Sequence, residues 1–221
     1  MQKDSSIPAG RPLAGVILCG GKSRRMGQDK FGIVFKGEAL LTRMERQLSQ
    51  WAAPVIIVAA EEQELPPVGP TAIIVRDILP QEGPLCGLTT AAEEFARCSQ
   101  GRPMPEHVWV TACDSPFVSL SAIQAMQSEM CDGIDAAVVR HDGQLHPLAA
   151  VYHINALQKM AHLFHQGERR MMAVCVLLTT KIIDSEQLRS RGVSLDFLTN
   201  LNTPEELDRV CRESDGAPDL E

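Results

Sequence analysis

A glycine-rich, positively charged segment directly follows the first apolar run of the chain. The run Leu13–Leu18 leads into residues 18–30, LCGGKSRRMGQDK, which contain three glycines and four cations. The adjacent Gly20 and Gly21 allow the backbone to approach a ligand closely and to point its amides at an anion. The cations suited to phosphate oxygens are Lys22, Arg24, Arg25 and Lys30. This composition favours a triphosphate site over the alternative of a solvated basic turn.

The same segment matches neither of the two common glycine-rich nucleotide motifs. In a P-loop the last glycine precedes Lys and Ser or Thr, whereas Gly27 precedes Gln28 and Asp29. The GxGxxG spacing of dinucleotide-binding folds does not occur in it either. The segment therefore predicts a phosphate site of another kind.

Two aspartates follow other apolar runs. Asp114 lies in TACDSPF (111–117), at the end of such a run, where a carboxylate is a suitable ligand for Mg²⁺ that bridges phosphates. Asp77 ends a second run, ahead of GPLCGL (83–88), in which Gly83 and Pro84 are expected to begin a helix. Taken singly, Asp114 could instead cap a helix and Asp77 could form a turn.

The elements that must position these residues alternate along the chain. Short apolar runs followed by amphipathic patterns imply a mainly parallel sheet with helices on both faces. The expected strands are Ala14–Cys19, Val55–Ala59, Ala72–Arg76, His107–Ala112 and Ala136–Arg140. The expected helices, with apolar residues three and four apart, are Leu40–Trp51, Leu85–Ala96 and Ser121–Met130. The predicted fold class is α/β, as a single-domain, Rossmann-like, three-layer α/β/α arrangement.

The remaining chain continues this pattern after one hairpin. Asp142 and Gly143 predict the turn of that hairpin. A helix near 154–166, a strand near 177–183 and a last helix from Thr203 are expected after it. We expect mobile tails at 1–12 and 214–221 around one domain at 13–213.

The positions of the three polar features predict a common site. Ligands bind at the carboxyl ends of the strands in an open parallel sheet. The opening segment, Asp77 and Asp114 all follow predicted strands, so we expect them at this one edge.

Composition limits the classes of partner. The 221-residue chain has a formal net charge of −7 and a pI near 5.4, which argues against a general nucleic-acid-binding protein. Its seven cysteines include no CxxC pair, as expected for small buried side chains in a reducing cytoplasm. The N-terminus lacks the apolar part of a signal peptide, and no stretch approaches a membrane span. We therefore expect a cytoplasmic protein with neither a nucleic-acid nor a membrane partner.

Six segments together resemble one enzyme family, the MobA-type molybdenum cofactor guanylyltransferases. LCGGKSRRMGQDK is similar to the family's LAGGxSxRMGxDK, with Cys19 in place of the usual alanine. GPLCGL, CDSPF and HPLAAVY resemble GPLAG, CDxPF and (H/Q)P, while GERRMM (167–172) and NLNTPEEL (200–207) resemble GxRRV(M) and NxNTPEDL. Other sugar and small-alcohol nucleotidyltransferases share the first motif, so the last two segments point to the molybdopterin enzyme.

The resemblance extends over roughly Leu13–Val210 and implies a fold like that of nucleotide-diphospho-sugar transferases, with a nucleotidyltransferase domain at 13–213. The GTP contacts expected on this basis, together with the glycines of the anion site, are Leu18, Cys19, Gly20, Gly21, Lys30, Asp77, Gly83 and Asp114. Asp114 is also the expected ligand of Mg²⁺ (or Mn²⁺). One segment departs from the family pattern, because AAEE (59–62) stands where the family often has an asparagine.

The expected molybdopterin side consists of Arg169, Arg170, Asn200 and Asn202. The two arginines could grip the phosphate of the pterin or could belong to a plain helix surface. His162 and His165 lie three apart on a predicted helix without a carboxylate pair, so a solvated helix face is favoured there over a metal site. Ser115 has no paired histidine and acid in a recognisable motif, which disfavours a hydrolase triad.

The activity implied by the resemblance is Mg²⁺-dependent transfer of GMP from GTP to the phosphate of molybdenum-molybdopterin, with release of pyrophosphate. The expected catalytic residues are Arg25, Lys30 and Asp114. The further partners implied are proteins that deliver molybdopterin or mature molybdoenzymes. Three alternatives remain: a cytidylyltransferase that acts on the same acceptor, an enzyme that transfers GMP to another acceptor, and a nucleotide-binding protein that hands over the cofactor without catalysis.

Overall fold

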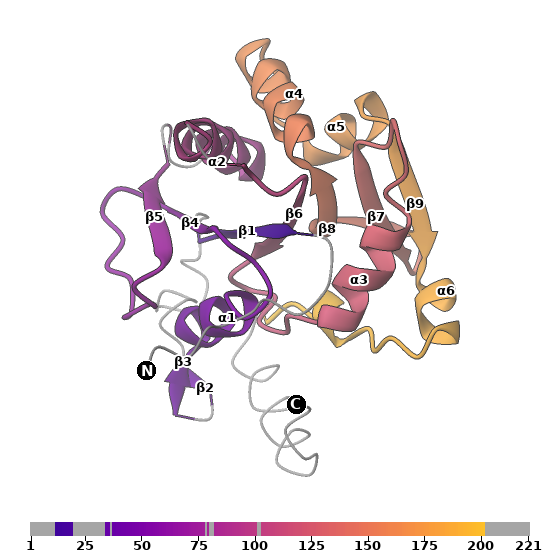
Figure 1. Cartoon of the computed structure of the whole chain (residues 1–221), viewed down its shortest axis with the longest axis horizontal. Coiled ribbons are helices and arrows are strands. Elements are labelled where there is room, and N and C mark those ends of the chain that lie inside the picture. Colours follow the sequence, from indigo (N-terminus) through magenta and orange to yellow (C-terminus); the bar gives the residue numbers. More distant parts are fainter. Residues whose placement is uncertain are drawn as a thin grey trace.

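A computed structural model describes residues 12–19, 34–35, 37–77, 79, 82–100 and 103–201. A seven-stranded sheet lies at its centre, with the strand order β5-β4-β1-β6-β8-β7-β9 (Figure 1). The strands are β1 Leu13–Leu18, β4 Val55–Ala59, β5 Ala72–Arg76, β6 His107–Ala112, β7 Ala136–His141, β8 Gln144–His153 and β9 Thr180–Asp184. All neighbouring pairs are parallel except the two that β8 makes with β6 and β7. The prediction of an α/β fold with a mainly parallel sheet is confirmed.

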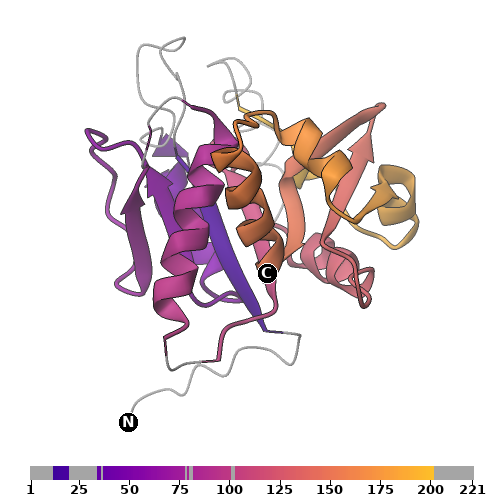
Figure 2. The same ribbon diagram turned by 90° about the horizontal axis from the view of Figure 1, so that it is seen from above.

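Helices cover both faces of this sheet (Figure 1). One face carries α2 Pro84–Cys98, α4 Ile154–His165 and α5 Met171–Leu177, and Figure 2 shows α2 and α4 side by side on it. The other face carries α1 Leu40–Leu48, α3 Leu120–Ser128, α6 Ser185–Ser190 and the 3-10 helix η3 Asp196–Leu198. A short antiparallel pair, β2 Val34–Phe35 and β3 Glu38–Ala39, precedes α1.

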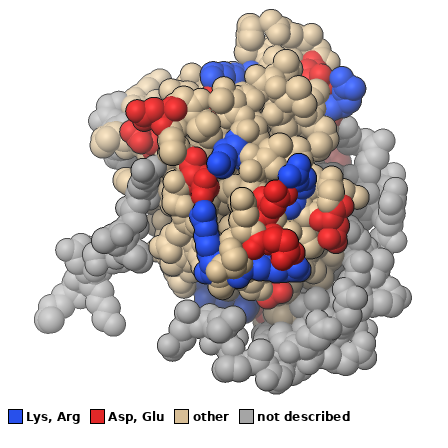
Figure 3. Space-filling view, turned by 90° about the vertical axis from the view of Figure 1, so that its right-hand side faces the viewer, with Lys and Arg blue, Asp and Glu red and all other residues tan. Residues whose placement is uncertain are grey.

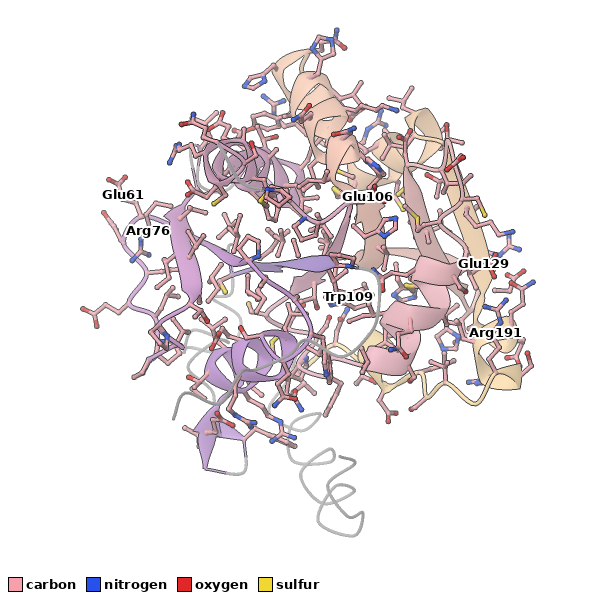
Figure 4. The ribbon with its side chains drawn as sticks, in the orientation of Figure 1. Glu61, Arg76, Glu106, Trp109, Glu129 and Arg191 are labelled. Carbon is pink, nitrogen blue, oxygen red and sulfur yellow. The ribbon has the colours of Figure 1, made fainter. Side chains whose placement is uncertain are left out.

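The core consists of two apolar layers, one on each side of the sheet. In β1, Val16 packs toward α2 and Ile17 packs toward α1, and both side chains are fully buried. Strands buried on both faces appear in the sequence as continuous apolar runs, which is why β1, β4 and β6 could be predicted. Trp109 of β6 fills the layer beneath α3 and lies against the ring of Phe197, with centroids 6.1 Å apart (Figure 4).

Charged side chains of both signs surround the β9 edge of the sheet (Figure 3). Arg140 and Asp184 form an ion pair of 2.7 Å, and Lys181 forms one of 3.4 Å with Glu129. Glu129 also accepts a hydrogen bond from Arg191 at 2.6 Å (Figure 4). The hydrogen bond from Arg191 lowers the pKa of Glu129 below its ordinary value. Charges at an edge strand oppose pairing with a second chain.

Most of the predicted elements occur where they were expected. The five strands from the sequence correspond to β1, β4, β5, β6 and β7, and the hairpin turn has Asp142 and Gly143 at φ 48° and 75°. The helix α1 ends at Leu48, earlier than the expected Trp51, and the last expected strand begins at Thr180. The sequence did not predict β2, β3, α5, α6 or η3, because so few residues give no measurable periodicity.

Two parts of the sequence prediction cannot be compared with the structure. The helix expected from Thr203 lies outside the described residues, as do the tails 1–12 and 214–221 apart from Pro12. No helix in the described part of the chain combines the length and apolar character that crossing a membrane requires.

Candidate active site

The carboxyl ends of four parallel strands lie along one edge of the sheet. Leu18 at the end of β1 pairs with Val58 of β4 and Ala112 of β6, and Ala59 pairs with Arg76 of β5. The residues that follow these strands, including Asp77 after β5 and Asp114 after β6, therefore emerge at the same edge. This is the arrangement that the sequence predicted for these two carboxylates.

The sheet also separates the two carboxylates. The order β5-β4-β1-β6 places three inter-strand spacings between the ends of β5 and β6. At about 4.8 Å for each spacing, these ends lie roughly 14 Å apart. Asp77 and Asp114 thus cannot share one metal ion, but they can contact opposite ends of an extended nucleotide.

Asp77 is held by the first turns of α2. Its Oδ1 accepts hydrogen bonds from the thiol of Cys86 at 3.1 Å and from the hydroxyl of Thr90 at 3.4 Å. Burial, followed by the bond to Asp77, raises the pKa of Cys86 to about 12. The thiol therefore stays protonated near neutral pH and remains a hydrogen-bond donor to Asp77.

Two glycines bring α2 close to the strand ends. A Cβ on Gly87 would lie 3.1 Å from the side chain of Leu18, a contact so tight that the Leu18 side chain would have to shift by a few tenths of an ångström to admit it. Gly83, the N-cap residue of α2, has φ 92°, and Pro84 begins the helix as predicted. A Cβ on Gly83 would lie 3.9 Å from the carbonyl oxygen of Arg169, which places the GERRMM segment beside the start of α2.

Leu18 and Cys19 lie beneath the edge with buried side chains. The amide of Cys19 donates to the carbonyl of Val58 at 2.7 Å, and its carbonyl accepts from Nε2 of Gln63 at 3.0 Å. Oε1 of Gln63 also accepts from the amide of Ala60 at 2.8 Å. Both backbone groups of Cys19 are thus bonded within the protein, and we infer that Leu18 and Cys19 fix where the opening segment begins.

Gln63 is a supporting residue that the sequence did not reveal. It follows the segment 59–62, where the family asparagine was missing, and its amide joins the end of β4 to the end of β1. Arg76 of β5 secures the same loop by donating to the carbonyls of Ala60 and Gln63 at 2.8 and 2.9 Å (Figure 4). The only sequence signal was a polar amide shortly after a buried strand.

Cys19 and Cys113 face each other beneath the site, at the ends of the neighbouring strands β1 and β6. The hydrogen bond with the Cys113 thiol, followed by burial, raises the pKa of Cys19 well above its ordinary value. A thiol in this state is a small packing group and a poor nucleophile.

The loop after β6 is joined to the segment that contains Asn200. The amide of Ser115 donates to the carbonyl of Ala112 at 2.9 Å, which turns the chain at Asp114. The amide of Leu201 donates to the carbonyl of Asp114 at 2.7 Å, and the hydroxyl of Ser115 donates to Oδ1 of Asn200 at 2.6 Å. The structure therefore brings Asp114 and Asn200 together although they lie far apart in sequence.

A small apolar cluster supports this junction. Leu201 is buried with Phe35 of β2 and Leu40 of α1, and Phe117 packs against them. The rings of Phe35 and Phe117 meet edge to face at 6.3 Å. Three segments that are distant in sequence, around residues 35–40, 117 and 201, thus meet under the loop that carries Asp114.

The two arginines of GERRMM differ in their surroundings. Arg169 donates to Glu82 at 2.8 Å and to the carbonyls of Phe164 and Glu168 at 2.8 and 2.9 Å, and its guanidinium lies 4.1 Å from the centroid of the Phe164 ring. Arg170 is 80% exposed and pairs only with Glu168 among the described residues, at 3.2 Å. Residues 163 and 166–170 line a cavity of about 550 Å³. Arg169 is thus engaged in structure, whereas Arg170 is available to an anion.

His146 of the HPLAAVY segment lies at the same edge. Thr111 of β6 pairs with Ala149 of β8, so the residues of β8 before Ala149 extend toward the end of β6. Burial, followed by the nearby His141, lowers the pKa of His146. Its imidazole is therefore neutral near pH 7.

The described residues suit a Mg²⁺ ion that is already coordinated by the phosphates of a nucleotide. No group of three or more His, Cys, Asp or Glu side chains in the described ranges could hold a metal by itself. Asp114 offers a half-buried carboxylate at a strand end. One or two carboxylates with substrate phosphates and water are the usual Mg²⁺ environment, so this donor set suits a nucleotide-bound ion.

Five of the expected site residues cannot be placed. Gly20, Gly21, Arg25, Lys30 and Asn202 lie outside the described residues.

Sequence comparison relates the chain to one family of transferases. Residues 15–181 match the sequence profile of the MobA-like NTP transferase domain. A probable molybdenum cofactor guanylyltransferase of Mycobacterium tuberculosis is 35% identical over 198 residues, which cover 87% of this chain and 90% of that protein. A protein of the same name from Opitutus terrae is 33% identical over 210 residues, which cover 91% and 96%.

Solved structures support the fold. The molybdopterin-guanine dinucleotide biosynthesis protein A of Archaeoglobus fulgidus superimposes with a TM-score of 0.72 at 22% identity, over 92% of this chain and 100% of that one. The 2-C-methyl-D-erythritol 4-phosphate cytidylyltransferase of Thermus thermophilus gives 0.59 at 16% identity, over 91% and 99%. At these identities the likeness concerns the fold alone.

Proposed function

The chain belongs to the MobA-like NTP transferase family, and from this premise we propose that it transfers GMP from GTP to the phosphate of molybdenum-molybdopterin. The observation that carries the proposal is the placement of Asp77 and Asp114 at one sheet edge, on either side of the strand that leads into the cation-rich segment 18–30. The guanine base and the pterin acceptor are taken from the named relatives.

The nucleotide would lie across the ends of β5, β4, β1 and β6. The backbone amides of Gly20 and Gly21, with Arg25 and Lys30, would bind the phosphates, and Asp77 and Gly83 would contact the opposite end of the nucleotide. Asp114 would hold Mg²⁺, which when bound neutralises phosphate charge. A cation-rich segment on an acidic chain suits two polyanionic substrates.

The reaction would be a displacement at the α-phosphorus of GTP. An oxygen of the acceptor phosphate forms a bond to this phosphorus, and the bond to the bridging oxygen of the β-phosphate breaks, so that pyrophosphate leaves. The attacking phosphate is already ionised at neutral pH and needs no general base. Catalysis by this chain would rest on positioning and on stabilisation of the charge that develops on pyrophosphate by Arg25 and Lys30.

The residues expected to bind the acceptor are Arg169, Arg170, Asn200 and Asn202. Among the described residues, Arg169 lies beside Gly83 at the start of α2, whereas Asn200 is joined to the loop that carries Asp114. Of the two arginines, Arg170 is better placed to bind the acceptor phosphate, because its guanidinium is 80% exposed and its one ion pair among the described residues, with Glu168, lies at the surface where a phosphate can replace it. Arg169 would hold the loop in place through its contacts with Phe164 and Glu82.

The cell compartment and the protein partners belong to the same proposal. We place the reaction in the cytoplasm, where the six cysteines of the described residues, none of which forms a disulfide within that part of the chain, would stay reduced. Proteins that supply molybdopterin and proteins that insert the product into molybdoenzymes would be the partners.

The test is a transfer assay under anaerobic conditions. Purified protein is incubated with molybdenum-molybdopterin, Mg²⁺ and one of GTP, CTP or ATP, and the products are identified by mass spectrometry, with pyrophosphate release measured in parallel. We expect the guanine dinucleotide from GTP. A preference for CTP would assign the chain to cytidylyl transfer, and nucleotide binding without transfer would support a handover protein.

A further inference from the structure

Ser115 makes a hydrogen bond that none of the roles described above requires. It occupies the variable position of CDSPF, next to Asp114, and its side chain is buried with 5% relative exposure. Its hydroxyl lies 2.6 Å from Oδ1 of Asn200, a residue 85 positions away in sequence. A bond this short between such distant segments strongly constrains the side chain of Asn200.

The direction of this hydrogen bond determines which side-chain groups of Asn200 can bind a ligand. Because the hydroxyl of Ser115 donates to the amide oxygen, the two N–H donors of Asn200 are the part of the side chain without a partner among the described residues. Asn200 is exposed to solvent, so these donors are accessible. Amide donors held in this way suit an anion such as a phosphate.

The same junction links Asn200 to Asp114. The amide of Leu201 donates to the carbonyl of Asp114 at 2.7 Å, and Leu201 itself is buried against Phe35 and Leu40. A displacement of one segment therefore displaces the other. The distance between the metal-binding carboxylate and the donors of Asn200 is set by these two hydrogen bonds.

We propose that Ser115 is a positioning residue for the acceptor substrate: it orients Asn200 so that the amide N–H groups face the acceptor phosphate at a fixed distance from Asp114. The inference rests on the proposed function, since it takes the acceptor to be a phosphate. Ser115 acts through Asn200 and does not touch the substrate itself.

Two single variants separate this role from a purely structural one. In Asn200→Asp the carboxylate still accepts the bond from Ser115, so the junction is kept, but the two donors are replaced by a negative charge. We expect the KM for molybdenum-molybdopterin to rise at least tenfold and the KM for GTP to change less than twofold. Ser115→Ala frees the amide and should raise the acceptor KM about fivefold, again with little effect on GTP.

A double variant tests whether Ser115 acts through Asn200. In the Asn200→Ala background, Ser115→Ala should add less than a twofold further change in the acceptor KM. Ser128→Ala is the matched control, because its hydroxyl likewise donates a hydrogen bond, to the backbone carbonyl of Ala125, but at the exposed end of α3. Circular dichroism confirms that each variant is folded.

The outcomes separate this inference from the proposed function. An unchanged acceptor KM in Asn200→Asp, or fully additive effects in the double variant, would overturn the role of Ser115. Absence of transfer in the wild-type protein would overturn the proposed function instead. Anaerobic titration with molybdopterin then still measures acceptor binding, and equal affinity of the wild-type protein and Asn200→Asp would reject the inference as well.

Discussion

The thiol of Cys86 donates a hydrogen bond to the carboxylate of Asp77, with Sγ 3.1 Å from Oδ1. Cys86 stands on the first turns of α2, and Asp77 follows β5, so the bond fixes a strand-end carboxylate to the helix packed beside it. The raised pKa of Cys86, about 12, keeps the donor proton in place over the physiological range. Oδ1 of Asp77 is thus hydrogen-bonded within the protein, and we expect Oδ2 to contact the nucleotide.

Loss of this donor should weaken nucleotide binding. In Cys86→Ala the carboxylate of Asp77 loses the shorter of its two side-chain hydrogen bonds within the described residues, keeps the longer bond from Thr90 at 3.4 Å, and gains rotational freedom. We expect the dissociation constant for GTP to rise several-fold, about 1 kcal/mol, by isothermal titration calorimetry. Cys86→Ser retains a donor and should stay within about twofold of the wild-type protein.

The exposed Cys131 provides the matched control for this experiment. Cys131→Ala should leave GTP affinity unchanged, and Cys131 should react with iodoacetamide at pH 8 while Cys86 stays protected in the folded protein. Equal GTP affinities of Cys86→Ala and wild-type protein would mean that the thiol does not orient Asp77.

Asp114→Asn should nearly abolish turnover without unfolding the protein. The amide keeps the shape of the side chain but removes the charge that attracts Mg²⁺, and losing such an electrostatic contributor lowers rates on the order of 10²-fold or more. Initial rates at saturating Mg²⁺ measure the effect, with Asp196→Asn on the exposed face of η3 as the control. Turnover within about threefold of the wild-type protein would exclude Asp114 as the metal ligand.

Replacing the two arginines of GERRMM should have different consequences. Arg169→Ala removes the contact with the Phe164 ring and the bonds to two carbonyls, so we expect a loss of roughly 1–2 kcal/mol in the free energy of unfolding. Arg170→Ala should change stability by less than about 0.5 kcal/mol, because its ion pair is exposed.

For molybdopterin binding we expect the reverse order, with Arg170→Ala having a larger effect than Arg169→Ala. Arg170→Ala should weaken molybdopterin binding by about 1.5–3 kcal/mol, the usual range for a charged hydrogen bond, while GTP affinity stays within about twofold. Urea unfolding and anaerobic binding titrations give the two quantities. A collapse of GTP binding in Arg170→Ala would place this residue on the nucleotide side.

The pKa of Glu168 should show whether its hydrogen bonds with Arg169 and Arg170 are formed. Hydrogen bonds from Arg170, first from its side chain and then from its amide, and from the amide of Arg169, lower the pKa of Glu168 from 4.5 to about 2. Because the pKa is lowered on folding, the associated stability is fully present above pH 4.5 and is lost as the pH falls toward 2. Solvent screening keeps this contribution small, since the group is exposed.

A carboxyl-carbon NMR titration checks that expectation. In the wild-type protein Glu168 should remain ionised at pH 3.5, and in Arg170→Ala its pKa should move back toward 4.5. Glu186, an exposed partner of Arg189 on α6, serves as the reference carboxylate. A pKa of Glu168 that is the same in both proteins would show that Arg170 does not hold it.

The sequence by itself determined the elements whose signals are local. Strands buried on both faces appear as apolar runs, the pair Gly83 and Pro84 marks the start of α2, and Asp142 with Gly143 marks the hairpin turn. Parallel strands end at one edge, so the order of elements along the chain was enough to expect Asp77 and Asp114 on the same side of the sheet. The motifs then indicated the family.

Only the tertiary structure decided which side chains support the site. Gln63 reaches Cys19 across 44 positions, Ser115 reaches Asn200 across 85, and Arg169 reaches Glu82 across 87. Each partner is selected by the packing of segments that are distant in sequence, and such pairs leave no periodicity or spacing that a sequence can display. Short elements such as β2 and α5 were missed for a related reason, because packing stabilises them more than their own few residues do.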